Sequence, residues 1–228
     1  MEPTRRPSPP YNPSVRALVR GKREPCLPLS QKDVERGFLG WHENGYLPHR
    51  DDPGLIQFIT FRLADAFPEA LRSEWETLLA IEDDRERRIE LEGYLDKGRG
   101  ECHLRRPDIA KVVEDSLRFR HGAQYELRAW VVMPNHVHLL FQVGKVPMWR
   151  LVDAWKGYTA KEANKILGRN GRFWQDGYWD TYMRNGVHEG RTRRYIENNP
   201  IRAGLVTAAG DWPCSSARFR DQAGSLQL

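Results

Sequence analysis

The feature that most constrains the fold is a pair of apolar runs separated by only two residues. Residues 124–133 read QYELRAWVVM and residues 136–143 read HVHLLFQV, both rich in β-branched and aromatic side chains. Pro134 and Asn135, which lie between them, are residue types that interrupt strands and favour turns. The sequence therefore predicts two consecutive strands of an antiparallel sheet in the middle of the chain.

Further elements are expected on both sides of these strands. Residues 55–63 are typical of a strand that is buried on at least one face. Helices are predicted for residues 68–79, for the heavily charged and therefore solvated segment 83–97, and for residues 107–117, 148–168 and 190–198. Residues 40–50 are expected to be a loop, and residues 172–184 a strand or an ordered loop. This order predicts an α+β domain with an antiparallel sheet and helices on one face.

The first 35 residues differ in composition from the rest of the chain. Seven of the 15 prolines precede Leu29, together with six arginines and lysines. Because such a segment has too few apolar residues to pack, we expect a flexible basic arm at 1–35, a folded domain at 36–216 and a C-terminal tail at 217–228. The arm either stays solvated or contacts phosphates. With 36 Lys and Arg against 31 Asp and Glu, the net charge of +5 suits a polyanionic partner without requiring one.

The remaining composition points to a cytoplasmic protein with no membrane partner. The three cysteines are scattered and none form a CxxC pair, so neither a disulfide framework nor a zinc knuckle is expected. No apolar run is long enough to cross a bilayer, and the N-terminus lacks the apolar region of a signal peptide.

The first candidate for chemistry is the pair His136 and His138. Side chains alternate along a strand, so these two imidazoles share one face and form half of a divalent-metal site. The alternative is an ordinary pair of solvent-facing strand histidines.

The second candidate is the pair Tyr195 and Asn199, which one helical turn brings to the same side. The phenol can serve as a nucleophile and the carboxamide as an oxygen ligand. Alternatively, the tyrosine packs in the core and the asparagine caps the helix before Pro200. Taken together, two nitrogens, one oxygen and a nucleophile are the groups that metal-assisted phosphodiester cleavage needs.

Several motifs carry a resemblance to a known family. WVVMPNHVHLLF (130–141), GRFWQDGYWDTYMRN (171–185) and YIENNPIRAGLV (195–206) resemble the REP-associated tyrosine transposases, relatives of the small HUH single-strand insertion-sequence transposases. The segment 40–63 is similar to the opening strand region of that family. The resemblance covers residues 40–216.

This resemblance implies a ferredoxin-like, RRM-type antiparallel sheet that carries a metal site. His136 and His138 would bind Mg²⁺ or Mn²⁺, and Tyr195 would attack single-stranded DNA beside a hairpin, leaving a 5′-phosphotyrosine. Asn199 stands where the mobile relatives have a glutamine, and because asparagine is shorter, it would bind the metal either directly or through a water molecule. By the same resemblance we expect a bacterial protein that is nucleoid-associated when bound to DNA, and a monomer, with a dimer as the alternative.

A DNA-binding surface is expected in the part of the sequence that follows the predicted strand 136–143. Basic and aromatic residues alternate there. Such surfaces stack bases and neutralise phosphates of single strands. The candidate basic residues are Lys156, Lys161, Lys165, Arg169, Arg172 and Arg184. The accompanying tryptophans, Trp155, Trp174 and Trp179, are either part of this surface or part of the core.

Two other functions compete with strand cleavage. One is a DNA hairpin-binding protein of the same fold that does not transfer strands. The other is an RNA-binding or RNA-processing protein, although residues 124–133 lack the aromatic signature of an RNA-binding sheet. A covalent protein–DNA adduct would separate the three.

Overall fold

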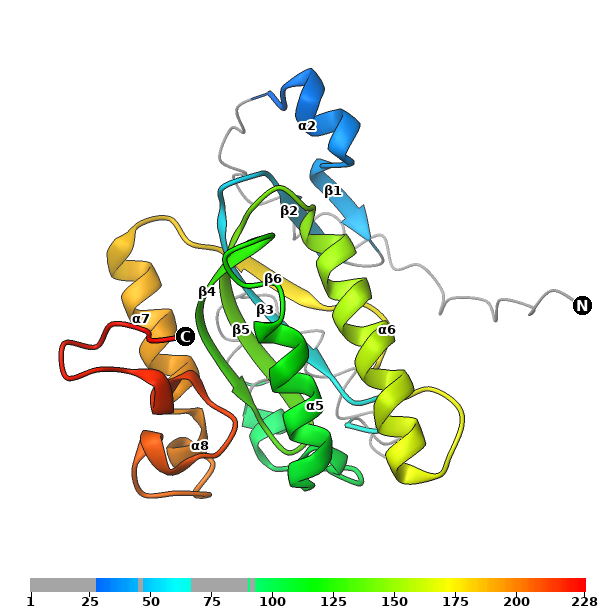
Figure 1. Cartoon of the computed structure of the whole chain (residues 1–228), viewed down its shortest axis with the longest axis vertical. Coiled ribbons are helices and arrows are strands. Elements are labelled where there is room, and N and C mark those ends of the chain that lie inside the picture. The colour runs from blue at the N-terminus through cyan, green and yellow to red at the C-terminus, as the bar shows by residue number, and fades with distance from the viewer. Residues whose placement is uncertain (1–27, 45–46, 67–89, 91–92) are drawn as a thin grey trace, which may run out of the picture.

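The structure is a computed structural model, and it describes residues 28–44, 47–66, 90 and 93–228. A four-stranded sheet, helices on either side of it and a projecting two-stranded hairpin make up this part of the chain (Figure 1). The elements are α2 (Gln31–Arg36), β1 (Gly40–Asn44), β2 (Leu47–Asp51), β3 (Ile56–Arg62), η2 (His103–Arg105), α5 (Pro107–Arg118), β4 (Tyr125–Val132), β5 (His136–Val143), α6 (Met148–Leu167), β6 (Trp179–Tyr182), α7 (Gly186–Glu197), α8 (Asn199–Arg202), η3 (Ala209–Asp211) and η4 (Ser216–Phe219).

The main sheet has the strand order β4-β5-β3-β6, and every neighbouring pair is antiparallel. The three predicted strands are confirmed as β3, β4 and β5, and β6 shows that part of 172–184 is a strand. In the register between β3 and β5, Thr60 lies opposite His138 and Arg62 lies opposite His136. Directly opposite residues of an antiparallel pair share a face, so these four side chains lie on the same side of the sheet.

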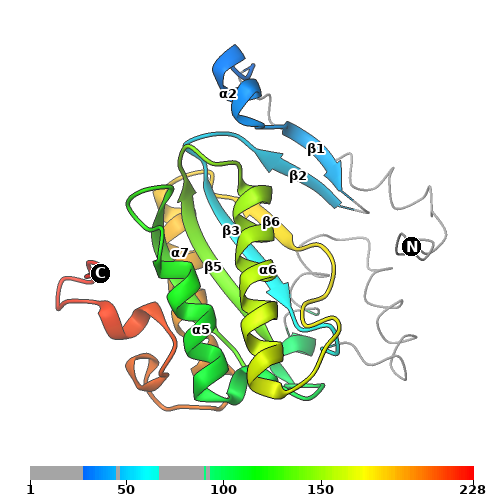
Figure 2. The same cartoon turned by 45° about the vertical axis from the view of Figure 1, so that its right-hand side comes forward.

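The two faces of the sheet have different covers (Figure 2). Helices α5 and α6 pack on one face over the larger apolar cluster, which includes Val137, Leu139 and Phe141 of β5. Helix α7 packs on the opposite face, where Ile196 meets Leu140 in a smaller cluster. The α+β class and the antiparallel sheet are confirmed, and α5 and α6 share one face as expected. The expectation of helices on one face does not hold for α7, because the strands also expose apolar side chains on the other side.

Residues 40–50, expected to be a loop, form most of the hairpin of β1 and β2. The strands pair antiparallel from Gly40 opposite Asp51 to Asn44 opposite Leu47. Glycine, asparagine and proline are poor strand formers, which explains the wrong prediction.

Two helix predictions upstream of α5 have different outcomes. The predicted helix 68–79 lies outside the described residues. Of the predicted solvated helix 83–97, the described residues 90 and 93–96 are helical, but Tyr94 and Leu95 among them are buried rather than solvated. The periodicity of a highly charged segment concealed two residues that pack into the core.

The C-terminal segment 217–228 packs against the domain. The ring of Phe219 lies 5.6 Å from that of Trp130. Arg220 donates hydrogen bonds to Glu197 on α7 and to the main-chain oxygen of Arg128 on β4. These contacts make the segment part of the folded domain rather than a tail.

The predicted N-terminal arm lies mostly outside the described residues, which begin at 28. Its last residues form the short helix α2, capped by Ser30, whose side chain accepts a hydrogen bond from the main-chain nitrogen of Asp33. None of the helices described here is long and apolar enough to cross a membrane.

Candidate active site

His136 and His138 lie on the face of β5 that α7 covers. Their side chains are 1 % and 0 % exposed, so they are not solvent-facing strand histidines. Their Nε2 atoms face each other at 3.1 Å. The period-two spacing of the two residues therefore brings two ring nitrogens together inside the protein.

Asn135 fixes the protonation pattern of the first histidine. Its amide nitrogen donates to the main-chain oxygens of Leu95 at 3.3 Å and Arg99 at 3.1 Å. Because those two acceptors identify the amide nitrogen, the amide oxygen is the atom that lies 2.8 Å from Nδ1 of His136. An amide oxygen can only accept, so Nδ1 carries the proton and Nε2 presents a lone pair.

Thr60 holds the second histidine in a less restrictive way. Its hydroxyl lies 2.8 Å from Nδ1 of His138. A hydroxyl can donate or accept. His138 can therefore keep its proton on Nε2 and donate to His136, or carry it on Nδ1 and present a second lone pair.

The electrostatic surroundings keep the first imidazole neutral. Burial, with a smaller contribution from the positive charge of Arg62, lowers the pKa of His136 to about 3. Burial also lowers the pKa of Arg62, to about 9, so this guanidinium remains charged near neutral pH. The result is a neutral nitrogen donor next to a buried cation.

Tyr195 reaches the same place from α7. Its hydroxyl lies 3.5 Å from Nε2 of His138, and its ring stands edge-on to Phe58 of β3. The ring is half-buried, and the guanidinium of Arg202 lies 4.8 Å from its centroid. The structure thus brings the predicted nucleophile and both predicted nitrogen ligands together.

Asn199 completes the group from the first residue of α8. Its amide nitrogen donates to the Tyr195 hydroxyl at 3.3 Å, as the i and i+4 spacing predicts. Its side chain is fully buried, and its amide oxygen has no hydrogen-bond partner. A buried acceptor without a partner costs about 1–3 kcal/mol, which makes this oxygen an available ligand.

These donors are compatible with one metal ion. His136 and His138 would hold the ion through their Nε2 atoms, which lie 3.1 Å apart. Within the described part of the chain, no three His, Cys, Asp or Glu side chains come together in a group that could hold a metal. The third protein ligand would therefore be the amide oxygen of Asn199.

Comparison with known proteins identifies the segment that builds this site. Residues 107–199, which contain both histidines, the tyrosine and the asparagine, match the family described as "Transposase IS200 like". This segment is therefore similar to the IS200-like transposases.

Two sequence relatives bear the name of one branch of these transposases. The REP-associated tyrosine transposase of Escherichia coli is 28 % identical over 115 residues, covering 48 % of this chain and 64 % of the relative. A relative from Haemophilus influenzae, which carries a provisional form of the same name, is 27 % identical over 103 residues, covering 40 % of this chain and 58 % of the relative. The chain thus matches less than two thirds of either relative.

A solved structure of a REP-associated tyrosine transposase bound to a REP hairpin is also similar. It is 20 % identical, the match covers 78 % of this chain and 86 % of that one, and the TM-score is 0.48.

Contacts from the C-terminal segment hold α7, the tyrosine helix, which carries Tyr195. Glu197, two residues after Tyr195, accepts hydrogen bonds from Ser216 at 2.8 Å and from Arg220 at 2.7 Å. Arg193 approaches the same carboxylate at 3.9 Å. Glu197 therefore anchors the helix from the side that faces away from the histidines, in agreement with its position on the helix.

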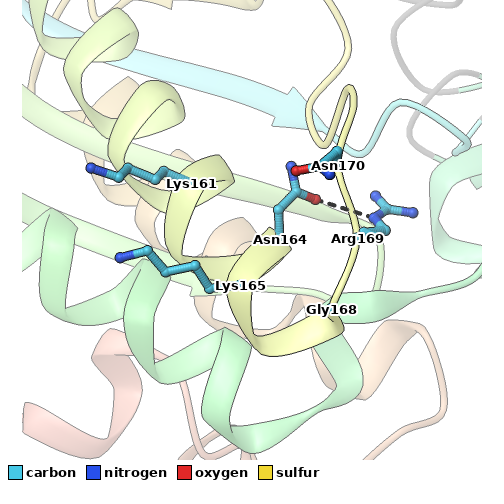
Figure 3. A pocket seen from close by; sticks show the side chains of 6 residues that line it. All are labelled: Lys161, Asn164, Lys165, Gly168, Arg169 and Asn170. Atoms are coloured by element: carbon cyan, nitrogen blue, oxygen red, sulfur yellow. Dashed lines mark hydrogen bonds between the residues drawn. The ribbon is translucent and has the colours of Figure 1, made fainter.

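The predicted DNA-binding residues do not form one surface. Lys161, Lys165 and Arg169 line a hollow at the end of α6, where Arg169 bonds to Asn164 (Figure 3). Helix α6 lies on the face opposite the site, so the sheet separates this hollow from Tyr195.

The other three predicted residues lie in different surroundings. Lys156 is buried enough to lower its pKa to about 8, and it donates to the main-chain oxygens of Gln175 and Gly177. Arg172 is exposed and pairs with Asp176. Arg184 is exposed just before α7. Lys156 thus has a structural task, and Arg184 is the member nearest in sequence to the tyrosine helix.

Three other tyrosines that could act as nucleophiles by residue type lie elsewhere. Tyr158 is 55 % exposed on α6, across the sheet from the histidines. Tyr178 is buried, which raises the pKa of its phenol. Tyr182 stands edge-on to Trp41 of the hairpin. Trp155 and Trp174 belong to the core, whereas Trp179 is half-buried beneath the guanidinium of Arg62.

Sequence reasoning missed four residues that surround the site: Asn135, Thr60, Arg62 and Arg202. Arg202 follows Tyr195 by seven residues, a spacing that helical periodicity could have identified. Asn135 precedes the first histidine, but was interpreted only as a turn residue. Thr60 and Arg62 lie on a strand more than 70 residues upstream, and only the register of β3 against β5 reveals them.

Proposed function

We propose that this domain cleaves and rejoins single-stranded DNA through Tyr195, with a divalent ion held by His136, His138 and Asn199. The observation that carries the proposal is the convergence of the tyrosine hydroxyl, 3.5 Å from His138, on two nitrogens that are 3.1 Å apart. A nucleophile beside a pair of imidazole ligands is the arrangement that metal-assisted phosphodiester cleavage requires.

Each residue has a separate task in this proposal. His136 offers a lone pair because Asn135 holds the proton on its other nitrogen. Asn199 donates to the tyrosine hydroxyl through its nitrogen, which leaves its oxygen for the ion. An Mg²⁺ or Mn²⁺ ion supplies Lewis-acid polarisation of a phosphate oxygen.

The covalent step exchanges one phosphoester bond for another. The oxygen of Tyr195 bonds to phosphorus, and the bond from phosphorus to the 3′ oxygen of the preceding nucleotide breaks. The phenol loses its proton, and the departing 3′ oxygen gains one. The products are a 5′-phosphotyrosine and a free 3′-OH, and attack by another 3′-OH in the reverse direction rejoins the strand.

The substrate class follows from the family resemblance. We infer single-stranded DNA that contains a hairpin, since the sequence motifs are those of the REP-associated branch and the two sequence relatives bear that name. The basic side chains of the domain suit this polyanion.

Incubation with hairpin-containing single-stranded DNA and Mn²⁺, followed by denaturing electrophoresis, tests the proposal. We expect a covalent adduct that migrates with the protein and survives denaturation. Tight DNA binding without an adduct would favour a hairpin-binding protein. Selective binding of RNA would favour the third function considered above.

A further inference from the structure

The two flanks of α7 have different surroundings. Glu189, Arg193 and Glu197 follow one another at intervals of four residues, so they share one flank of the helix. A carboxylate oxygen of Glu189 lies 4.0 Å from Nε of Arg128 on β4, and Arg193 lies 3.9 Å from the carboxylate of Glu197. The C-terminal segment lies beside α7 (Figure 1), and its Arg220 donates to Glu197 at 2.7 Å. The charges of this flank are therefore compensated within the protein.

The opposite flank carries the proposed nucleophile and two exposed arginines. Successive helical residues are rotated by about 100°, so residues two positions from Arg193 point to nearly the opposite side. These residues are Arg191 and Tyr195, and the side chain of Arg191 is exposed. Arg202 on α8 is also exposed, and its guanidinium lies 4.8 Å from the ring centroid of Tyr195. One arginine thus precedes the tyrosine on this flank, and the other follows it.

These two arginines have the chemistry of a phosphate-binding surface. Among the residues that the structure describes, no carboxylate forms an ion pair with Arg191 or Arg202. A guanidinium is always charged and presents its donors as a planar fork, which matches the oxygens of a phosphate. The flank that carries Tyr195 therefore suits an anionic chain, whereas the flank that carries Glu197 does not.

The spacing of the arginines suits a strand that crosses the tyrosine. One helical turn, with a rise of about 5.4 Å, separates Arg191 from Tyr195. Arg202 approaches the ring of Tyr195 from the other end of this flank. A DNA strand laid along the flank presents one phosphate per nucleotide. With one phosphate at the Tyr195 hydroxyl, its two neighbours come within reach of the two guanidinium groups.

We propose that Arg191 and Arg202 bind the backbone phosphates on either side of the phosphate that Tyr195 attacks. These contacts hold the strand in register, so they determine which phosphodiester is cut. The inference rests on the proposed function, because the position of the strand is defined by Tyr195 as the nucleophile.

The salt dependence of binding tests these contacts without cleavage. The probe is a fluorescent DNA hairpin with a single-stranded flank, bound in EDTA by proteins that also carry Tyr195→Phe. Arg191→Gln and Arg202→Gln should each reduce the slope of log affinity against log salt concentration by about 0.7, the value for one phosphate contact on a single strand. The double variant should lose about 1.4, and Arg202→Lys should restore the slope that Arg202→Gln loses.

Arg120→Gln is the matched control, because it removes an exposed arginine that follows α5 on the other side of the sheet. It should keep the slope of the protein with both arginines. An unchanged slope in the double variant would overturn the inference.

Methylphosphonate substitution identifies the phosphates that are bound. Each substitution removes the charge of one phosphate, and two phosphates separated by one other should weaken binding to the protein with both arginines. One of these effects should disappear in Arg191→Gln and the other in Arg202→Gln, since groups in direct contact give non-additive changes. If both variants stay sensitive at the same positions, the arginines do not touch these phosphates and the inference is wrong.

A failure of the proposed function looks different. If the wild type forms no covalent adduct with Mn²⁺, Tyr195 is not a nucleophile, whatever the salt slopes show. If the wild type forms the adduct, Arg191→Gln/Arg202→Gln should cut at several neighbouring phosphates, as mapped on a sequencing gel. A single cut at the wild-type phosphate, together with an unchanged salt slope, would overturn only the role of the arginines.

Discussion

The two faces of the main sheet share the same strands but use them differently. On β5, Val137, Leu139 and Phe141 face α5 and α6 in the larger apolar cluster, while His136 and His138 face α7. Both sets are almost completely buried. The first set loses water and gains close packing, whereas the second set loses water and must replace it with hydrogen bonds.

On the face toward α7, protein side chains form hydrogen bonds with the buried histidines in place of water. Asn135 satisfies His136, and Thr60 satisfies His138. Among the described residues of this face, the amide oxygen of Asn199 is a buried acceptor without a hydrogen-bond partner. One face is therefore built for stability, and the other accepts an unfavourable buried group where a ligand would bind. The following substitutions test this division.

Tyr195→Phe should have the largest effect, complete loss of the covalent adduct. It removes only the phenolic oxygen, so the ring keeps its contact with Phe58 and hairpin binding should persist. Adduct formation is measured by denaturing electrophoresis. Tyr158→Phe, on the exposed side of α6, is the control and should form the adduct normally. An adduct on the Tyr195→Phe protein would assign the nucleophile to another tyrosine.

Phe141→Ala should mainly change stability. Phe141 is fully buried against Tyr125 and Trp155, and truncation of such a phenylalanine costs about 3–5 kcal/mol. Chemical denaturation measures the free energy of unfolding. The folded fraction should still bind Mn²⁺ with the wild-type affinity. A selective loss of metal binding without a loss of stability would contradict the division between the faces.

His136→Ala and His138→Ala should each reduce cleavage by at least about 10- to 100-fold, the range seen when even outer partners of a metal site are lost. Hairpin binding should survive, because it depends on phosphate contacts and stacking elsewhere. EDTA should abolish DNA cleavage by the wild-type protein, and addition of Mg²⁺ or Mn²⁺ should restore cleavage. Cleavage that persists in EDTA would show that the histidines are ordinary buried residues.

Asn199→Ala should have the smallest effect of the proposed ligands. Its loss removes one oxygen donor and the hydrogen bond to Tyr195, and water can replace the oxygen. We expect a smaller loss of cleavage than for either histidine, with the unfolding free energy unchanged or raised because a buried acceptor without a partner is removed. A loss as large as that of the histidine variants would make Asn199 an equal ligand.

The central part of the site could be predicted from short-range patterns. Alternation along a strand placed the two histidines on one face, and one helical turn joined Tyr195 to Asn199. Neither pattern shows that the strand and the helix face each other. The family resemblance supplied that relation at the sequence level, and the structure supplies the distances.

The remaining residues depend on relations that a single sequence does not display. The register of β3 against β5 brings Thr60 and Arg62 to the site. Glu197 anchors the helix of Tyr195 through a hydrogen bond from Arg220, which lies in the segment that was predicted to be a tail. For the same reason, the sequence did not show that the predicted DNA-binding residues have different surroundings, and their contacts with DNA stay a prediction. Lys156 and Lys161 are five residues apart on one helix, yet one is bonded to main-chain oxygens and the other is exposed.

The anchor of the tyrosine helix has a consequence for the order in which the site is assembled during synthesis. Glu197 is held by Ser216 and Arg220, and Arg220 also reaches back to the main chain of β4. A nascent chain that already contains both histidines and Tyr195 still lacks these contacts. The contacts of Glu197 with Ser216 and Arg220 therefore form only after these residues have left the ribosome, so the anchoring of the helix that carries Tyr195 is completed late in synthesis.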